Sequence, residues 1–549
     1  MSLPAFAPQA QLFSTAALSS QLFTPTDRYR LFAQKIYPLL AQARPEFEAL
    51  YCQDNGRPAV EPVLLLGVSI LQYLEGVPDR QAVDLLRYHA GWNLALNRSL
   101  GEGLFHPTVL VYFRDRLIQH QKSALAFAKI LEGLMAAGLV ERRSKQRLDS
   151  TQILGLLSRM SRLECVRESL RLALEELEQS AALFAKPSGW PQLWERYVSS
   201  KLDYRAEAST LPEKMNQAGV DGLELLEWVG KLSDAKISQG RQLLLLQRVL
   251  GENFEWAQGQ APIQKPAQPT GAVHNPHEPE AQWAAKGQGK QRKEHVGYKV
   301  QVAETVSPIK LAKGEPTANF ITAMVTQPAT ASDDAGLPLV ESEQASMGLE
   351  KPSQWHLDGA YVSAERLAQA QAEGREMIGP AQAAPKKEGK FSVEDFVIHV
   401  EERTATCPAG KQNTQCSRLE EEITGKISYR LEWSTHCRQC PLREQCVGAG
   451  QKHRTIVVGE HHTFLQARRQ EQKTDAFKEK ARARNAIEAT QSELVRGHGL
   501  RQARYRGTAK VRLQNYFIGA ACNAKRWIKR VIWELEHAKI GAKAAVASG

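Results

Sequence analysis

The sequence WHLDGAY, residues 355–361, places an aspartate at the end of a short apolar run and directly before a glycine. A carboxylate at the tip of a buried strand is costly unless a cation lies beside it, so Asp358 predicts a positively charged partner. Two similar acids lie far away: Asp149 follows a predicted short strand, and Glu488 lies in a basic helical stretch, 482–496. Three dispersed acids in a basic protein predict a metal-dependent enzyme that acts on nucleic acid.

Hydrophobic periodicity separates helical from strand-rich parts. Residues 25–121 are predicted to form short helices, which could be a DNA-binding head or equally a scaffold. Residues 296–302 alternate between apolar and polar or small side chains, the pattern of a β-strand, and 319–325 and 355–357 predict further strands. The mixture, with the acids at element ends, indicates an α/β enzyme.

These patterns and changes in composition predict seven segments. They are a helical N-terminal domain and candidate DNA-binding head (1–140), a first core strand with Asp149 (141–152), a helical insertion (153–255), a low-complexity linker (256–294), core strands with Asp358 (295–383), a β-rich cysteine insertion (384–460) and a helical part with Glu488 and a C-terminal helix (461–549).

The composition is that of a globular protein of several units. No apolar run reaches the roughly 18 residues of a membrane span. The first residues lack the basic start and long apolar centre of a signal peptide. We therefore expect no membrane association and a cytoplasmic location.

Positive charge is concentrated near Glu488. Residues 461–530 hold 17 Lys and Arg against 5 Asp and Glu, an excess of +12, whereas the whole chain carries +11. A basic cluster of this kind is typical of a surface that binds a polyanion, although a solvated basic face without a partner is the alternative.

The three acids suit two-metal phosphoryl transfer, in which carboxylates from separate elements hold ions about 3.5–4 Å apart. Mg²⁺, or Mn²⁺ in its place, is the expected ion. Each acid also has a simpler interpretation: Glu488 could pair with Arg484 four residues earlier, Asp149 could cap a helix, and Asp358 could be a turn aspartate.

Several stretches resemble the DDE transposases of bacterial insertion sequences, in the group numbered 1182, which is related to the groups numbered 4 and 5. The stretches are 79–82, 112–117, 149–151, 295–300, 326–330, 357–361, 484–488, 499–501 and 503–510, in the expected order. Related groups place a tyrosine three residues before the arginine of the arginine-x3-glutamate pattern and a lysine seven after the glutamate. Here those positions are Ala481 and Val495, with Arg496 the nearest cation.

The resemblance implies an RNase-H-like catalytic core. Asp149 would lie on its first strand, Asp358 after its fourth, and Glu488 on a following helix, and together they would hold the divalent metals. Arg484 would be the arginine of the arginine-x3-glutamate pattern.

Four of the eight cysteines fall between 416 and 446, a spacing that favours metal binding over disulfides in a cytosolic protein. Cys437, Cys440 and Cys446 supply three thiolates, and Cys407 a fourth, with Cys416 as competitor. Four thiolates favour structural zinc, although an iron–sulfur cluster needs the same ligands and simple reduced thiols are the alternative.

A row of cations follows Glu488 and is predicted to bind DNA phosphates. The candidate DNA-binding residues are Arg484, Arg496, Arg501, Arg504, Arg506 and Lys510.

The resulting hypothesis is a DDE transposase that cuts transposon ends and joins their 3′-hydroxyls to target DNA. Double-stranded DNA is the expected partner, a homodimer on DNA the expected assembly, and the bacterial nucleoid the expected place. Two rivals remain: a metal nuclease of the same fold that does not join strands, and a non-catalytic DNA-binding relic.

Overall fold

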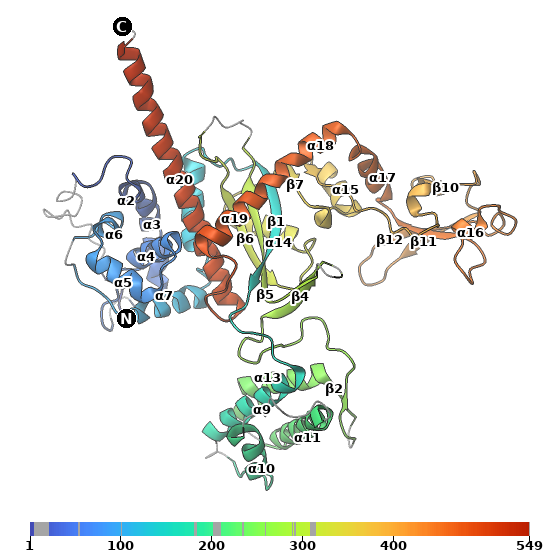
Figure 1. The fold of residues 1–549 in the computed structure, drawn as a ribbon, viewed down its shortest axis with the longest axis horizontal. Coiled ribbons are helices and arrows are strands. Elements are labelled where there is room, and N and C mark those ends of the chain that lie inside the picture. The colour runs from blue at the N-terminus through green and yellow to red at the C-terminus, as the bar shows by residue number, and fades with distance from the viewer. Residues whose placement is uncertain are drawn as a thin grey trace.

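The structure is a computed structural model (Figure 1). It describes residues 1–4, 21–52, 55–99, 102–180, 184–200, 210–232, 235–257, 260–287, 289, 292–307 and 314–547. No helix in this part of the chain is long and apolar enough to span a membrane.

A mixed β-sheet forms the centre. Its strands are β1 (Lys145–Leu154), β4 (Gln282–Lys286), β5 (Lys293–Thr305), β6 (Ile321–Pro328), β7 (Gln354–His356) and β8 (Glu376–Ile378). β5 runs antiparallel to β1 and pairs on its other edge with β4 and β6, also antiparallel, whereas β7 and β8 continue parallel on the far side of β1. β1 is thus the middle strand, which places Asp149 at the centre of the sheet.

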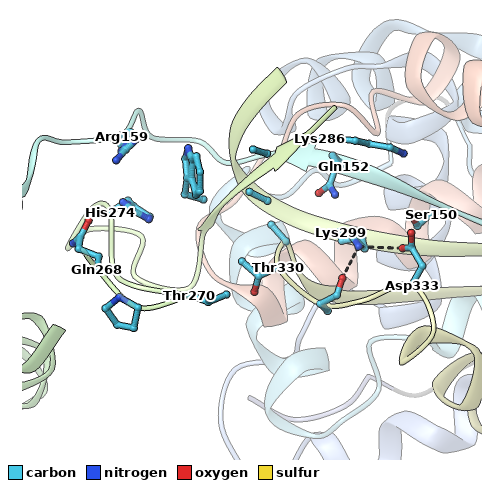
Figure 2. A pocket seen from close by; sticks show the side chains of 17 residues that line it. Ser150, Gln152, Arg159, Gln268, Thr270, His274, Lys286, Lys299, Thr330 and Asp333 are labelled. Atoms are coloured by element: carbon cyan, nitrogen blue, oxygen red, sulfur yellow. Dashed lines mark hydrogen bonds and ion pairs between the residues drawn. The ribbon is translucent and has the colours of Figure 1, made fainter. Parts of the chain in front are cut away.

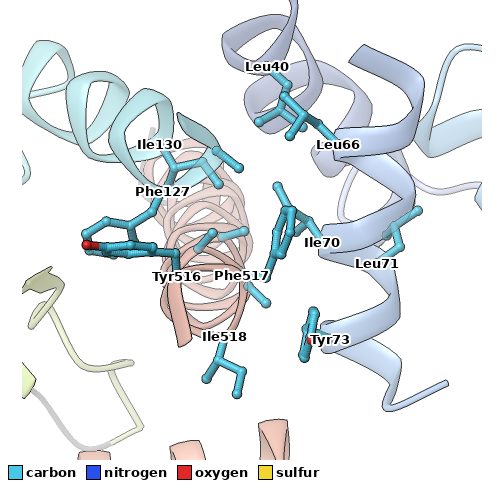
Figure 3. Close-up of a cluster of buried hydrophobic side chains, with 14 of the residues drawn as sticks. Leu40, Leu66, Ile70, Leu71, Tyr73, Phe127, Ile130, Tyr516, Phe517 and Ile518 are labelled. Carbon is cyan, nitrogen blue, oxygen red and sulfur yellow. The ribbon is translucent and has the colours of Figure 1, made fainter. Parts of the chain in front are cut away.

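Helices of the N-terminal unit precede the sheet. They are α2 (Arg28–Leu31), η1 (Phe32–Ile36), α3 (Tyr37–Ala41), η2 (Arg44–Leu50), α4 (Pro62–Glu75), α5 (Asp79–Tyr88), α6 (Ala90–Ala95), α7 (Thr108–Gln119) and α8 (Leu125–Ala136). α4 and α8 pack against the long C-terminal helix α20 (Thr508–Ala547), as Figure 3 shows. Tyr73 of α4 stacks on Phe517 of α20 with ring centroids 5.9 Å apart, which joins the two ends of the chain in one core.

α20 also lies against β6. The side chain of Asn523 accepts a hydrogen bond from the Ile321 N–H at 2.8 Å and donates one to the Ile321 carbonyl at 2.9 Å. Since a buried amide must form hydrogen bonds, this pair of hydrogen bonds holds α20 against β6 at the edge of the sheet. The C-terminal part of α20 then projects away from the rest of the molecule (Figure 1).

The helical insertion lies on one side of the sheet (Figure 1). It comprises α9 (Arg162–Gln179), α10 (Trp190–Trp194), η4 (Glu195–Ser199), α11 (Leu211–Gly230), α12 (Ala235–Ser238) and α13 (Arg241–Asn253), followed by the short pair β2 (Phe254–Glu255) and β3 (Ile263–Gln264). Ser161 and Glu164 form a capping box at the start of α9. The insertion has its own apolar core.

After β6 the chain alternates helices and strands and then enters the cysteine insertion, which begins with η8. The elements are α14 (Gly336–Ser346), η7 (Gly359–Tyr361) and α15 (Ala364–Ala372), then η8 (Val393–Asp395), β9 (Val397–His399), β10 (Thr404–Thr406), β11 (Gln415–Glu420), β12 (Ile427–Glu432), α16 (Arg443–Cys446) and β13 (Thr455–Gly459). The last helices before α20 are α17 (His462–Glu471), α18 (Asp475–Ala481), η9 (Arg482–Asn485) and α19 (Ala486–His498).

The predicted low-complexity linker, 256–294, is wrong in part. Its second half contains β4 and the start of β5, which pair with each other. His274, Asn275 and Glu278 within it are buried, and Glu278 accepts hydrogen bonds from the N–H groups of Leu156 and Leu157 at 2.9 and 3.0 Å. The polar composition of this segment did not indicate a folded structure, because the groups that its polar side chains bind lie on other segments of the chain.

Candidate active site

Asp149 lies in the middle of β1, so it does not cap a helix. Its Oδ1 accepts a hydrogen bond from the Ser150 N–H at 2.8 Å, and its side chain is 18 % exposed. Burial raises the pKa of the Asp149 carboxyl, and the nearby charge of Asp358 adds to this, while Arg484 and the Ser150 N–H oppose it. A cation beside Asp149 therefore stabilises its charged carboxylate.

Asp358 follows β7 and caps the turn η7, where its carboxylate accepts a hydrogen bond from the Gly359 N–H. It is thus a turn aspartate, but its position has a second consequence. β7 runs parallel to β1 with His356 opposite Arg147, so two residues further along each strand Asp358 and Asp149 come side by side. The Asp358 side chain is 53 % exposed.

Arg484 joins the two aspartates. Its Nη2 lies 3.2 Å from Oδ2 of Asp149 and 3.2 Å from Oδ2 of Asp358. The alternative ion pair between Arg484 and Glu488 does not occur among the ion pairs of the described residues. The reason is local: residues 482–485 form the tighter turn η9 before α19 begins, which turns Arg484 toward the sheet.

Glu488 lies in the first turn of α19 and is exposed. Gln491, one turn later on the same side, donates from Nε2 to the Ser150 carbonyl at 3.3 Å, so this side of α19 faces β1. The three acids nevertheless do not gather within 4.8 Å of one another in the part of the chain that the structure describes. The structure brings Asp149 and Asp358 to one cation, with Glu488 on the adjacent helix.

A buried charge cluster holds α19 on the sheet. Glu304 of β5 is fully buried and accepts hydrogen bonds from Arg147 Nε at 2.6 Å, Thr490 Oγ1 at 2.7 Å and Arg526 Nη1 at 2.9 Å. Arg147 also donates from Nη1 to the Ala483 carbonyl at 2.9 Å, directly before Arg484. Arg526 is only 3 % exposed, because it pairs with the buried carboxylate of Glu304.

A second group was not predicted. Ligand atoms of Glu493, His498 and Cys522 lie within 4.8 Å of one another between α19 and α20. Arg526 and Lys525 hold Glu493 at 2.9 Å each, and although burial alone would raise the pKa of this carboxyl, the two cations lower it to about 2. These cations already neutralise the carboxylate, so the group is a packed polar cluster between helices. Only the close spacing of α19 and α20 reveals it.

Four cysteines are among the residues that line one small cavity of about 20 Å³ in the insertion, although no three of their sulfur atoms lie within 4.8 Å of one another in the described part of the chain. They are Cys407, Cys437, Cys440 and Cys446. Cys416, the competitor, lies on β11 and is not among the described residues that line this cavity. The backbone N–H of Arg454 donates to the Cys437 Sγ at 3.4 Å.

The basic row divides into two kinds. Arg496, Arg501 and Arg506 are exposed. Arg504 lies with its guanidinium 4.5 Å from the ring centroid of Tyr73, and Lys510 pairs with Asp115 at 2.9 Å. Arg504 and Lys510 therefore also hold the N-terminal unit against the C-terminal part.

Comparisons with known proteins bear on the two ends of the chain. Residues 406–528 match the family described as Transposase DDE domain, and residues 18–116 match the family described as Transposase domain (DUF772). The two matches support a DDE transposase of the insertion-sequence type. A DDE transposase domain implies the use of a divalent metal, typically Mg²⁺, and action on DNA. Glu488 lies inside the first match, whereas Asp149 and Asp358 precede it. No curated protein matches the chain.

Proposed function

We propose that this DDE transposase cuts the ends of its element and joins them to target DNA, with Asp149, Asp358 and Glu488 as the catalytic, metal-holding acids. The convergence of Asp149 and Asp358 on one guanidinium carries the proposal. The two residues are far apart in sequence, and without Arg484 two carboxylates would face each other at a partly buried position. Such an arrangement is typical of a cation site.

The donor set fits a divalent ion. Mg²⁺ takes carboxylate oxygens from one or two side chains together with water and substrate phosphate oxygens. Asp358 is half exposed, which leaves room for DNA, and Glu488 on the adjacent helix α19 would supply a third carboxylate. When bound, the metal would activate the attacking oxygen and stabilise the leaving one.

Arg484 takes a second role in this proposal. A divalent ion and the guanidinium compete for the same carboxylate oxygens, so occupancy by the ion would release Arg484 to bind a DNA phosphate. Arg496, Arg501 and Arg506 would extend this phosphate contact as exposed cations, with Arg504 and Lys510 at its edge.

The sheet order supports an RNase-H-like core. In chain order the strands β1, β5 and β6 form an antiparallel unit, and β7 and β8 add on the other side of β1 in parallel. Membership of the group numbered 1182, a homodimer that brings two DNA ends together, and a nucleoid location belong to the same proposal.

We also propose that Cys407, Cys437, Cys440 and Cys446 bind a structural zinc ion. The cavity between them has room for about one small sphere, and the Arg454 N–H on Cys437 is the kind of contact that steadies a thiolate ligand. Elemental analysis should find about one zinc per chain, lost in Cys437→Ser and kept in Cys416→Ser. Visible absorption and bound iron would instead indicate an iron–sulfur cluster, and no metal at all would remove the site.

The joining step separates the proposal from a nuclease. Purified protein is incubated with Mg²⁺, a target plasmid and linear DNA that carries the pre-cut ends of the element. The proposal predicts covalent joining of the 3′-hydroxyl strands. Cleavage of intact ends without joining would favour the nuclease, and metal-independent DNA binding without either reaction would favour the relic.

A further inference from the structure

A cavity of about 610 Å³ lies between the sheet and the two segments that connect the sheet to the helical insertion (Figure 2). Its walls come from segments far apart in sequence. Arg159 lies between β1 and α9, Thr270 and His274 lie between β3 and β4, and Gln152, Lys286 and Lys299 lie on β1, β4 and β5. The DNA-binding residues predicted from the sequence do not line it.

The cavity carries unneutralised positive charge. Arg159 and Lys286 are exposed, and neither makes an ion pair with any residue that the structure describes. Lys299, by contrast, is buried and held by Asp333 at 3.0 Å (Figure 2). Two exposed cations that line a cavity and have no ion-pair partner among the described residues predict an anionic ligand.

An aromatic surface lies beside these cations. Trp283 of β4 is half-buried and lines the cavity, and the Arg159 guanidinium lies 5.5 Å from its ring centroid. His274 lies with its ring centroid 6.4 Å from that of Trp283, and burial, reinforced by the charge of Arg159, lowers the pKa of His274 to about 4. A neutral imidazole and an indole thus accompany the two cations.

The cavity adjoins the proposed catalytic acids. Ser150, which lines it, follows Asp149 directly, and the charge of Lys286 acts on the Asp149 carboxylate. A volume of 610 Å³ suits a small ligand or a few nucleotides, whereas double-stranded DNA, with a major groove alone about 12 Å wide, is too large to enter.

We propose that this cavity binds a short single-stranded segment of DNA, with phosphates at Arg159 and Lys286 and a base against Trp283. Cationic grooves with aromatic side chains are the usual means of binding single strands. The inference rests on the proposed function, because it adds a strand-binding site next to the acids. The segments that connect the helical insertion to the sheet would thereby hold a DNA strand against the sheet.

Binding of the full-length protein to fluorescent oligothymidylate and to a blunt duplex, in EDTA, tests the proposal. Single-strand affinity falls as salt rises, and each phosphate contact contributes about 0.7 to the steepness of log affinity against log salt. The variant Arg159→Ala/Lys286→Ala removes two contacts, so its plot should be less steep by about 1.4. Trp283→Leu should weaken single-strand binding roughly tenfold. The affinity for the blunt duplex should be unchanged in both variants.

Lys231→Ala/Arg418→Ala is the matched control, because it removes the same charge from exposed positions elsewhere. An equal loss in this control, or unchanged single-strand binding in the cavity variants, would overturn the proposal. Photocrosslinking of a bromodeoxyuridine strand should label the peptide that contains Trp283, and labelling elsewhere would contradict it. Failure of the proposed function can be told apart from failure of this inference. If the protein never cuts DNA but still binds a single strand through Arg159 and Lys286, the binding site stands and the transposase proposal is rejected.

Discussion

Two charged clusters involve residues of β1, and they are built differently. At Glu304, a fully buried carboxylate receives hydrogen bonds from two arginines and a threonine on three separate elements. At Asp149 and Asp358, two carboxylates share a single guanidinium, and one of them is half exposed. The first cluster cannot lose a member without stranding a buried charge, whereas the second can exchange its cation. We infer that the first fixes the position of α19 and the second is the site of exchange.

The largest effect is expected from Glu304→Ala. Loss of this carboxylate leaves Arg147 buried without an ion-pair partner and leaves Arg526 with Glu493 alone, which should lower the free energy of unfolding by about 3–5 kcal/mol. Urea unfolding measures this, with Glu294→Ala as control, since Glu294 pairs with Arg292 at the surface and should contribute less than about 1 kcal/mol. Equal effects in the two variants would remove the distinction between buried and exposed clusters.

A smaller effect of the opposite kind is expected from Arg484→Gln. The substitution removes the cation that competes for the two aspartates, so Mn²⁺ affinity should rise, by about fivefold to tenfold for a contact of about 1 kcal/mol. Calorimetric titration of Mn²⁺ measures it. Asp149→Asn, which removes a ligand, should lose affinity instead, and an unchanged affinity in Arg484→Gln would show that the guanidinium does not occupy the ion's place.

The smallest effect concerns pH. Because burial raises the pKa of Asp149 in the folded protein, the folded state binds this proton more tightly than the unfolded chain. The corresponding stability is present below the unfolded value of about 3.9 and is lost as pH rises through the raised folded value. Wild type should therefore gain stability relative to Asp149→Asn on acidification from neutral pH. Thermal unfolding across this range measures the difference, and a constant difference would contradict the raised pKa.

Local patterns predicted much of the secondary structure. The alternation at 296–302 predicted a strand, although β5 is more buried than alternation suggests because it is an inner strand. Apolar residues recur every three or four positions on the C-terminal helix, at 513, 517, 520, 524, 527 and 531. All but Val531 are buried where α20 packs against α4, α8 and β6. These features depend on neighbours in sequence, which is why they could be predicted.

Features that depend on distant partners could not be predicted in this way. Nothing near Arg526 indicates that Glu304, 222 positions earlier, draws it inward. Likewise, the helical spacing of Arg484 and Glu488 left open a pair between them, and the tight turn η9 directs Arg484 to the two aspartates instead. The proximity of Asp149 and Asp358 follows from the parallel register of β1 and β7, which periodicity does not specify.

Metal-dependent excision tests the central claim most directly. A plasmid that carries the gene with its flanking DNA is incubated with Mg²⁺ and wild type, Asp149→Asn, Asp358→Asn or Glu488→Gln, and release of the element is quantified alongside DNA binding. The account predicts a loss of roughly a thousandfold or more in each variant, since a bound ion supplies several kcal/mol, with DNA binding retained. Full cleavage by any one of the three variants would contradict it.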